Sequence, residues 1–205
     1  MKRVILGLYS LLSVTIIVNG FGEISQNVWG SFGMSMLTLI FMTLPFLIEK
    51  RFKLEFPREF LSVLLLFFYA SMFLGTANHF YTRFWWWDKM LHGFSGLIFA
   101  NLGFLIAMFL QNREKIGSAL NRILVALFAF CFSVAAGAVW EIYEYTMDEI
   151  FGFLYQGVGI HDTMTDIIAD ALGALIFALF LFFQGQGKIK MISEGEEKTT
   201  HDYGQ

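Results

Sequence analysis

Three groups of ionisable residues enter long apolar segments of this 205-residue chain. Each group contains residues three or four positions apart, a spacing that puts side chains on one face of a helix. Side chains of this kind are rare inside apolar segments unless they have a function. The groups are Asp88, Lys89 and His92; Glu141, Glu144 and Asp148; and Asp162, Asp166 and Asp170.

Carboxylates around one imidazole suit a divalent cation such as Mg²⁺, Mn²⁺, Ca²⁺ or Zn²⁺, and two-metal sites support phosphoryl transfer or hydrolysis. An acid–base site without metal would instead pair His92 with Glu141 or Asp170. These three are the candidate catalytic residues. Lys89 and Tyr145 are candidate substrate-binding residues, with Lys89 binding a phosphate or offsetting carboxylate charge. The candidate metal ligands are Asp88, His92, Glu141, Glu144, Asp166 and Asp170.

The charges of the three groups do not balance. Seven acids stand against Lys89 and, when it is protonated, His92. Two helix N-termini each add about half a positive charge, which leaves the sum negative. Because packing uncompensated carboxylates in a membrane is costly, some acids must be protonated, or a cation must be bound, or water must enter. Each of these alternatives is typical of a functional site.

Structural explanations stay open for several of these residues. Asp88 and Asp162 are suited to capping helix N-termini, and Asp148 and Glu149 to a solvated loop. The sequence contains no HExxH helix, P-loop or GxSxG elbow. None of the serines is a good nucleophile, and Ser95 is the best placed of them.

The composition indicates an integral membrane protein. Apolar and aromatic residues make up 57% of the chain and charged residues only 15%, and the mean hydropathy is +0.61. These values exclude a disordered chain, a nucleic-acid-binding protein and a disulfide scaffold; Cys131 has no partner cysteine. Six segments are long enough, or nearly so, to cross a bilayer as helices: Val4–Phe21, Trp29–Ile48, Phe60–Thr76, Met90–Leu110, Ile123–Tyr145 and Thr163–Phe183.

The basic residues predict the orientation in the membrane. Of the 14 Lys and Arg residues, only Arg83 and Lys89 fall on the side opposite the others. The positive-inside rule therefore places both termini in the cytoplasm and the three polar groups near the outer surface, where Trp85–Trp87 belong to an aromatic belt. The first segment also resembles a signal peptide, but its small-residue cleavage pattern is poor, so a retained span is favoured.

We expect an all-α polytopic membrane protein with an inner bundle formed by the last three spans. Small residues recur in these spans at three- and four-residue spacing, as at Gly93, Gly96 and Gly173, which lets helix backbones approach closely. The first three spans should pack around this bundle. Residues 1–184 would form one transmembrane domain, and 185–205 a polar cytoplasmic tail.

Three stretches resemble the signature blocks of the YjdF-type inner-membrane proteins of bacteria, a functionally uncharacterised family. More distantly, the chain resembles the VanZ-like family, which is associated with glycopeptide tolerance and the cell envelope. The likeness implies a bacterial plasma membrane but no substrate, and Gly157–Ile160 departs from the Gly-Arg stretch of the VanZ pattern. The three stretches are WWWDKMLHGFSG (Trp85–Gly96), AVWEIYEY (Ala138–Tyr145) and DTMTDIIADALGAL (Asp162–Leu175).

Three functions fit these observations. The first is an outward-facing site that binds or transforms a lipid-linked or envelope molecule, with a divalent cation such as Mg²⁺, Mn²⁺ or Zn²⁺ as cofactor. The second is a non-catalytic membrane factor whose polar groups lock helices or bind a partner. The third is a proton- or cation-coupled transporter, against which the wholly apolar stretches 123–132 and 175–183 argue. Membrane lipids are the expected surroundings, and the oligomeric state is left open.

Overall fold

The computed structural model describes residues 2–53, 55–110, 119–152, 156–157 and 159–184. In this part of the chain the secondary structure is helical, without strands, which confirms the all-α expectation. The expected tail 185–205 and the basic residues Arg113 and Lys115 lie outside the described residues. The elements are α1 (Lys2–Ser25), α2 (Trp29–Phe52), α3 (Arg58–Phe68), the π-helix η1 (Tyr69–Ala77), α4 (Phe80–Arg83), α5 (Trp87–Leu110), α6 (Ala119–Phe151) and α7 (Ile160–Gln184).

Six helical stretches are long and apolar enough to cross a membrane, so the chain is membrane-embedded. The third of them combines α3 with η1. The fifth, α6, has 33 residues and runs beyond the expected end at Tyr145 to Phe151. At about 1.5 Å per residue it measures about 50 Å, more than the roughly 30 Å of a hydrocarbon core. Polar residues end its apolar stretch without ending the helix, because most of them are adequate helix formers.

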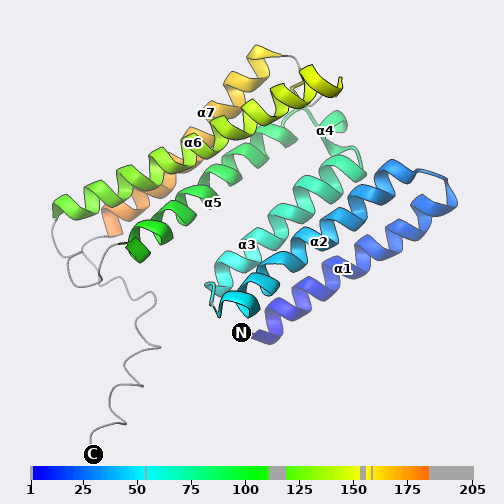
Figure 1. Ribbon diagram of the computed structural model, residues 1–205, viewed down its shortest axis with the longest axis horizontal. Coiled ribbons are helices and arrows are strands. Elements are labelled where there is room, and N and C mark those ends of the chain that lie inside the picture. The colour runs from blue at the N-terminus through cyan, green and yellow to red at the C-terminus, as the bar shows by residue number, and fades with distance from the viewer. Residues whose placement is uncertain (1, 54, 111–118, 153–155, 158, 185–205) are drawn as a thin grey trace, which may run out of the picture.

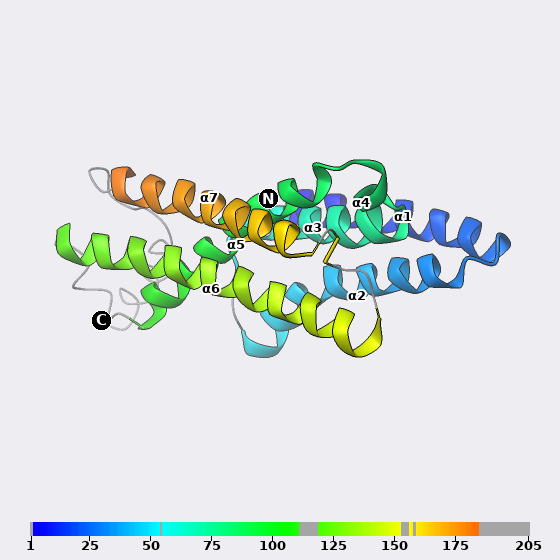
Figure 2. The same ribbon diagram turned by 90° about the horizontal axis from the view of Figure 1, so that it is seen from above.

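The helices form two layers that lie side by side (Figures 1 and 2). Helices α5, α6 and α7 pack against one another, and α1, α2, α3 and η1 form the other layer. The main contacts between the layers run from α5 to α3, α4 and η1. The expectation that the first three spans surround the last three is therefore wrong, because their apolar side chains pack chiefly on each other.

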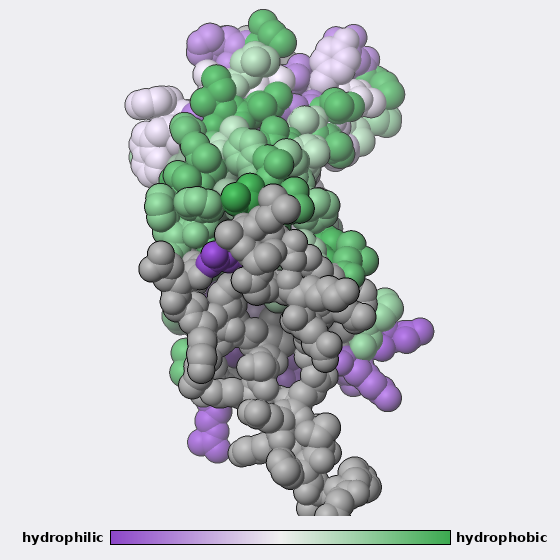
Figure 3. All heavy atoms as spheres, turned by 90° about the vertical axis from the view of Figure 1, so that its left-hand side faces the viewer, coloured by the Kyte–Doolittle hydropathy of each residue, from purple (hydrophilic) through white to green (hydrophobic). Residues whose placement is uncertain are grey.

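Large apolar side chains fill the layer formed by α1 to η1. Ile16, Met42, Leu61 and Leu65 are fully buried there. A smaller apolar cluster, which includes Phe104, closes the end of the α5–α7 bundle away from the polar groups. Many other apolar side chains are exposed, and Figure 3 shows a broad hydrophobic surface with hydrophilic side chains gathered at its edges. Such a surface suits contact with lipid tails.

Glycines bring the backbones of α5 and α7 together. A Cβ atom at Gly173 would collide with the carbonyl oxygen of Gly93, and one at Gly96 with the carbonyl oxygen of Asp170. Helix α6 joins them through Ser133, whose hydroxyl donates to the Gly96 carbonyl oxygen at 2.8 Å. The close packing expected from the small residues is confirmed at these positions.

Candidate functional site

The polar groups of the sequence meet at one end of the α5–α7 bundle. The helices run antiparallel in succession, so the start of α5, the end of α6 and the start of α7 lie at the same end (Figure 1). Four of the polar side chains are buried, with exposed fractions between 1% and 8%. They are His92, Glu141, Asp166 and Asp170.

Asp170 holds the inner nitrogen of His92. One carboxylate oxygen lies 3.0 Å from His92 Nδ1, and the other accepts a hydrogen bond from the Ser95 hydroxyl. Gly137 of α6 leaves the space for this carboxylate, because a Cβ atom there would collide with Asp170 Oδ2. With Nδ1 donating to Asp170, the lone pair of the imidazole is on Nε2.

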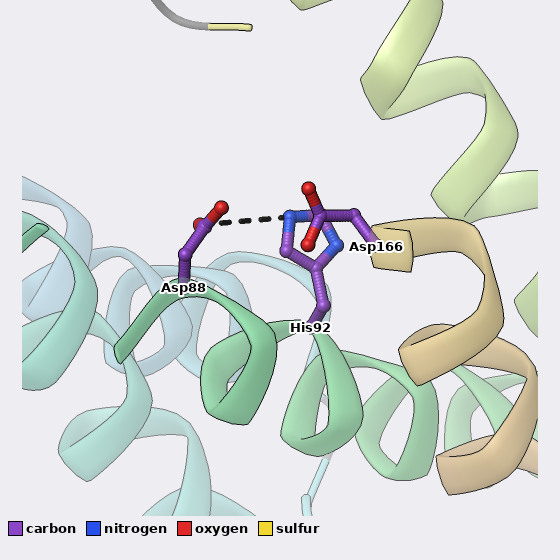
Figure 4. A group of neighbouring side chains, drawn as sticks. All are labelled: Asp88, His92 and Asp166. Carbon is purple, nitrogen blue, oxygen red and sulfur yellow. Dashed lines mark ion pairs between the residues drawn. The ribbon is translucent and has the colours of Figure 1, made fainter. Parts of the chain in front are cut away.

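His92 Nε2 faces two further carboxylates. Asp88 Oδ1 lies 3.8 Å away and Glu141 Oε1 3.7 Å away, which is too far for a hydrogen bond. Asp166 of α7 approaches the same imidazole (Figure 4). Ligand atoms of Asp88, His92 and Asp166 all lie within 4.8 Å of one another. Atoms that bind one cation at about 2.0–2.2 Å from it lie at most about 4.4 Å apart, so small side-chain rotations would bring these atoms within bonding distance of one ion.

Glu141 is the least satisfied acid of the site. It is 3% exposed, and neither carboxylate oxygen has a hydrogen bond within geometric limits, although the Thr163 hydroxyl is close enough to interact. A buried carboxylate without donors is costly. It therefore calls for a positive charge or a proton donor in the space beside His92 Nε2.

Lys89 supplies one positive charge on the other side of Asp166. Its ammonium group lies 2.7 Å from Asp166 Oδ1 and 3.6 Å from Asp88 Oδ2, and it also forms an ion pair with Asp162. Within the described residues, five acids thus surround two basic groups, Lys89 and His92. With all five acids ionised, the site stays negative even when His92 is protonated.

Three expected residues stand apart from this group. Glu144 accepts a hydrogen bond from the Trp140 indole at 3.0 Å, and Asp148 accepts one from the backbone N–H of Gln156 at 2.9 Å. Tyr145 is exposed. These side chains lie on the C-terminal turns of α6, further along the helix axis than Glu141 by about 1.5 Å per residue.

The sequence assigns Tyr81 of α4 to the aromatic belt and not to the site. Its ring packs on Gly75 of η1, where a Cβ atom would collide with it. Partial burial of the phenol, reinforced by the negative charges of Asp88 and Glu144, raises the pKa of Tyr81, although 37% of the residue surface is exposed. The phenol therefore stays protonated and able to donate beside the acids. A short helix packed on a glycine leaves no periodic pattern that would have identified it.

An open apolar groove lies between α5 and α6 next to this site. Its volume is about 620 Å³. Trp140 lines the groove and also donates its hydrogen bond to Glu144, so the groove reaches the level of the carboxylates. The lining residues are Phe99, Phe132, Ala135, Ala136, Val139, Trp140 and Tyr143.

Comparison with known proteins identifies a family. The chain is 26% identical over 144 residues to an uncharacterised protein of Thermotoga maritima, an alignment that covers 70% of this chain and 72% of the relative. No solved structure matches. Residues 4–187 match the family model described as "Predicted membrane protein (DUF2238)". The chain belongs to this DUF2238 family of membrane proteins.

Proposed function

We propose that the end of the α5–α7 bundle binds a divalent cation through Asp88, His92 and Asp166. The observation that carries this proposal is the set of carboxylates around His92 Nε2. Glu141 and Asp166 are buried and Asp88 is half-buried, and Asp88 and Glu141 lie too far from Nε2 for hydrogen bonds but near enough to share one ion with it. The net negative charge of the site supports it further.

Asp170 would position the imidazole rather than bind the ion. Histidine ligands of metals usually donate their second N–H to a carboxylate, which fixes the ring and raises its basicity. The His92 Nδ1–Asp170 distance of 3.0 Å fits this role. Glu141, with both oxygens free of hydrogen bonds, is suited to take a proton from a water or substrate hydroxyl beside the ion. The ion would polarise a phosphoryl or carbonyl oxygen.

The substrate class that we propose is a lipid-linked or cell-envelope molecule. The apolar groove of α5 and α6 offers space for a hydrocarbon chain, and Trp140 connects it to Glu144 at the level of the acids. Lys89 and Tyr145 would contact the polar head, with Lys89 giving up part of its ion pairing to a phosphate.

We also propose a bacterial plasma membrane as the location, with both termini cytoplasmic. The distribution of basic residues supports this orientation. Membership of the YjdF-type proteins and the distant VanZ likeness are part of the same proposal, carried by the motifs at Trp85–Gly96 and Asp162–Leu175.

Cation binding is tested on the purified full chain. Elemental analysis, followed by chelation and titration with Mn²⁺, should give about one tightly bound ion per chain. His92→Ala should abolish binding, whereas His161→Ala, an exposed histidine at the start of α7, should leave it intact. Wild-type protein that binds no divalent ion and keeps its full stability after chelation would refute the proposal.

A helix lock without catalysis is the second candidate. Lys89 of α5 ties Asp162 and Asp166 of α7 by direct ion pairs, which would hold the two helices without any ligand. Removing one partner of a fully buried pair is destabilising by about 3–5 kcal/mol, and the part-exposed Lys89 should cost less. The lock predicts that Lys89→Met lowers stability equally with and without cation. The cation site predicts that part of the loss is restored when Mn²⁺ is added.

Transport is the third candidate and has the weakest support. A through-path would need polar side chains in the half of the bundle beyond Asp170. Among the described residues of that half, Phe104, Ala129 and Leu181 form an apolar cluster instead. Uptake of protons or cations by proteoliposomes, absent in Asp170→Asn, would support this candidate against the first.

A further inference from the structure

A buried carboxylate outside the α5–α7 site lies in the other layer, between α1 and α2. Glu23, in the last turns of α1, is 8% exposed. It faces Ser35 of α2, which is fully buried. Neither residue belongs to the α5–α7 site, and the proposed function makes no use of them.

The Glu23 carboxylate is only half satisfied. Its Oε1 accepts hydrogen bonds from the Asn19 amide at 2.8 Å and from the Ser35 hydroxyl at 3.1 Å. Its Oε2 is buried and has no hydrogen bond. Two neutral donors therefore serve one oxygen, while the other faces the protein interior unpaired.

No basic side chain of α1 or α2 can neutralise Glu23. The nearest one along α1 is Arg3, twenty positions away, which is about 30 Å along a helix. On α2 the basic residues Lys50 and Arg51 lie in the last turn, at the opposite end from Ser35. A buried carboxylate without a counter-charge is costly.

We propose that Glu23, Asn19 and Ser35 bind a monovalent alkali cation such as Na⁺. The available ligands are oxygens, which suit hard cations: the free Oε2 of Glu23, the hydroxyl of Ser35 and the amide oxygen of Asn19, which a half-turn of that amide brings to the carboxylate. The site contains one carboxylate and no imidazole or thiol. A single positive charge neutralises it, whereas a divalent ion would leave an excess charge buried.

Binding would tie α1 to α2. Asn19 and Glu23 come from one helix and Ser35 from the other, so an ion held between them links the pair near its connecting loop. Ligand bound only by the folded state stabilises it in proportion to the logarithm of ligand concentration. The layer formed by α1 to η1 should therefore be more stable in Na⁺ than in an organic cation.

Thermal unfolding of the purified full chain in NaCl, KCl and choline chloride of equal ionic strength tests this, with chelator present to remove divalent ions from the other site. The midpoint should be higher in NaCl or KCl than in choline chloride and should rise with the concentration of the alkali cation. Glu23→Gln should abolish the difference between salts and Ser35→Ala should reduce it. Glu55→Gln, an exposed acid near the start of α3, should keep the full difference. Equal midpoints in NaCl and choline chloride would overturn the proposal.

A chemical readout covers the case in which Glu23→Gln does not fold. A hydrophobic carbodiimide modifies buried carboxyl groups, and wild-type Glu23 can be followed by mass spectrometry of its peptide. Na⁺ should protect Glu23 in a concentration-dependent way, while choline should not. Modification that proceeds at the same rate in both salts means that a proton, rather than Na⁺, neutralises the group, and this result overturns the proposal as well.

Discussion

The two layers differ in the contacts that hold their own helices together. In the layer of α1 to η1, large apolar side chains such as Leu61 and Leu65 fill the interior, and neutral hydroxyl pairs such as Tyr9 with Thr43 join the helices. In the α5–α7 bundle, Gly93 and Gly173 let backbones touch, and ionised side chains bridge the helices.

This difference shows why the polar site is in the second layer. Aspartate has a short side chain, so Asp166 and Asp170 of α7 reach the side chains of α5 only where the backbones approach closely. Bulky apolar residues would hold the helices about 8–10 Å or more apart and leave the acids unpaired. Close packing at the glycines is therefore required for the acids of α7 to contact α5. Apolar packing in the other layer contributes stability instead.

The largest effect should follow from closing the glycine contact. Gly173→Val would drive side-chain atoms into the Gly93 carbonyl. The loss of folding free energy should exceed the roughly 1–3 kcal/mol that overpacking usually costs, because the obstructing atom belongs to the backbone. We expect no folded bundle by size-exclusion chromatography and thermal unfolding. Gly33→Val, at a position of α2 where a Cβ meets nothing, should fold; if both variants fold equally well, close approach is not essential.

A cavity in the other layer should lower stability without changing the site. Leu61→Ala removes a fully buried side chain and should cost about 2–5 kcal/mol. Cation affinity should stay within about twofold of wild type, because α3 contributes no ligand. Denaturant unfolding and Mn²⁺ titration of one preparation measure both. A loss of affinity comparable with that of His92→Ala would mean that the layers are not independent.

Asp170→Asn should lower the affinity for the cation with little loss of stability, the reverse of the result expected for Leu61→Ala. The amide can still contact His92 and Ser95, but it no longer fixes the imidazole with a full negative charge. Loss of such a supporting carboxylate typically lowers metal affinity about 10–100-fold, and we expect a change of this size in Mn²⁺ titration with only a modest fall in unfolding midpoint. A large fall in stability at unchanged affinity would favour the helix lock instead.

The smallest predicted effect concerns Tyr81. Its raised pKa means that the folded protein keeps the phenolic proton at a pH where the unfolded chain has lost it. The stability that this contributes is complete below a pH of about 10, the ordinary tyrosine pKa, and falls as pH rises further. Tyr81→Phe should flatten the alkaline fall in the unfolding midpoint. An unchanged alkaline profile would show that the carboxylates of Asp88 and Glu144 do not act on the Tyr81 phenol.

Periodicity and composition predicted much of this structure. Apolar length predicted the six spans, and four-residue spacing predicted that Asp166 and Asp170 share the close-packing face of α7, because both depend only on local geometry. The side-by-side arrangement of the layers was not predicted. The arrangement depends on which faces of α1 to η1 pack against one another. Helices that are apolar all round have no sequence pattern that distinguishes those faces from the exposed ones.

Within the site, the sequence identified the residues better than their partners. His92 and Glu141 were expected to lie together, and they do. The engagement of Asp170 by Ser95 and the separation of Glu144 from the group depend on helix rotation and rotamers. Residue spacing alone predicts the rotation of each helix about its axis only to within about one residue position, and it does not predict rotamers.

The most direct measurement is an anomalous-scattering map from crystals of the wild-type protein grown with Mn²⁺. The proposed site predicts a peak about 2.0–2.3 Å from His92 Nε2, also bonded to one oxygen each of Asp88 and Asp166, with Asp170 still on Nδ1. No peak at this position, with His92 Nε2 hydrogen-bonded directly to Glu141, would contradict it.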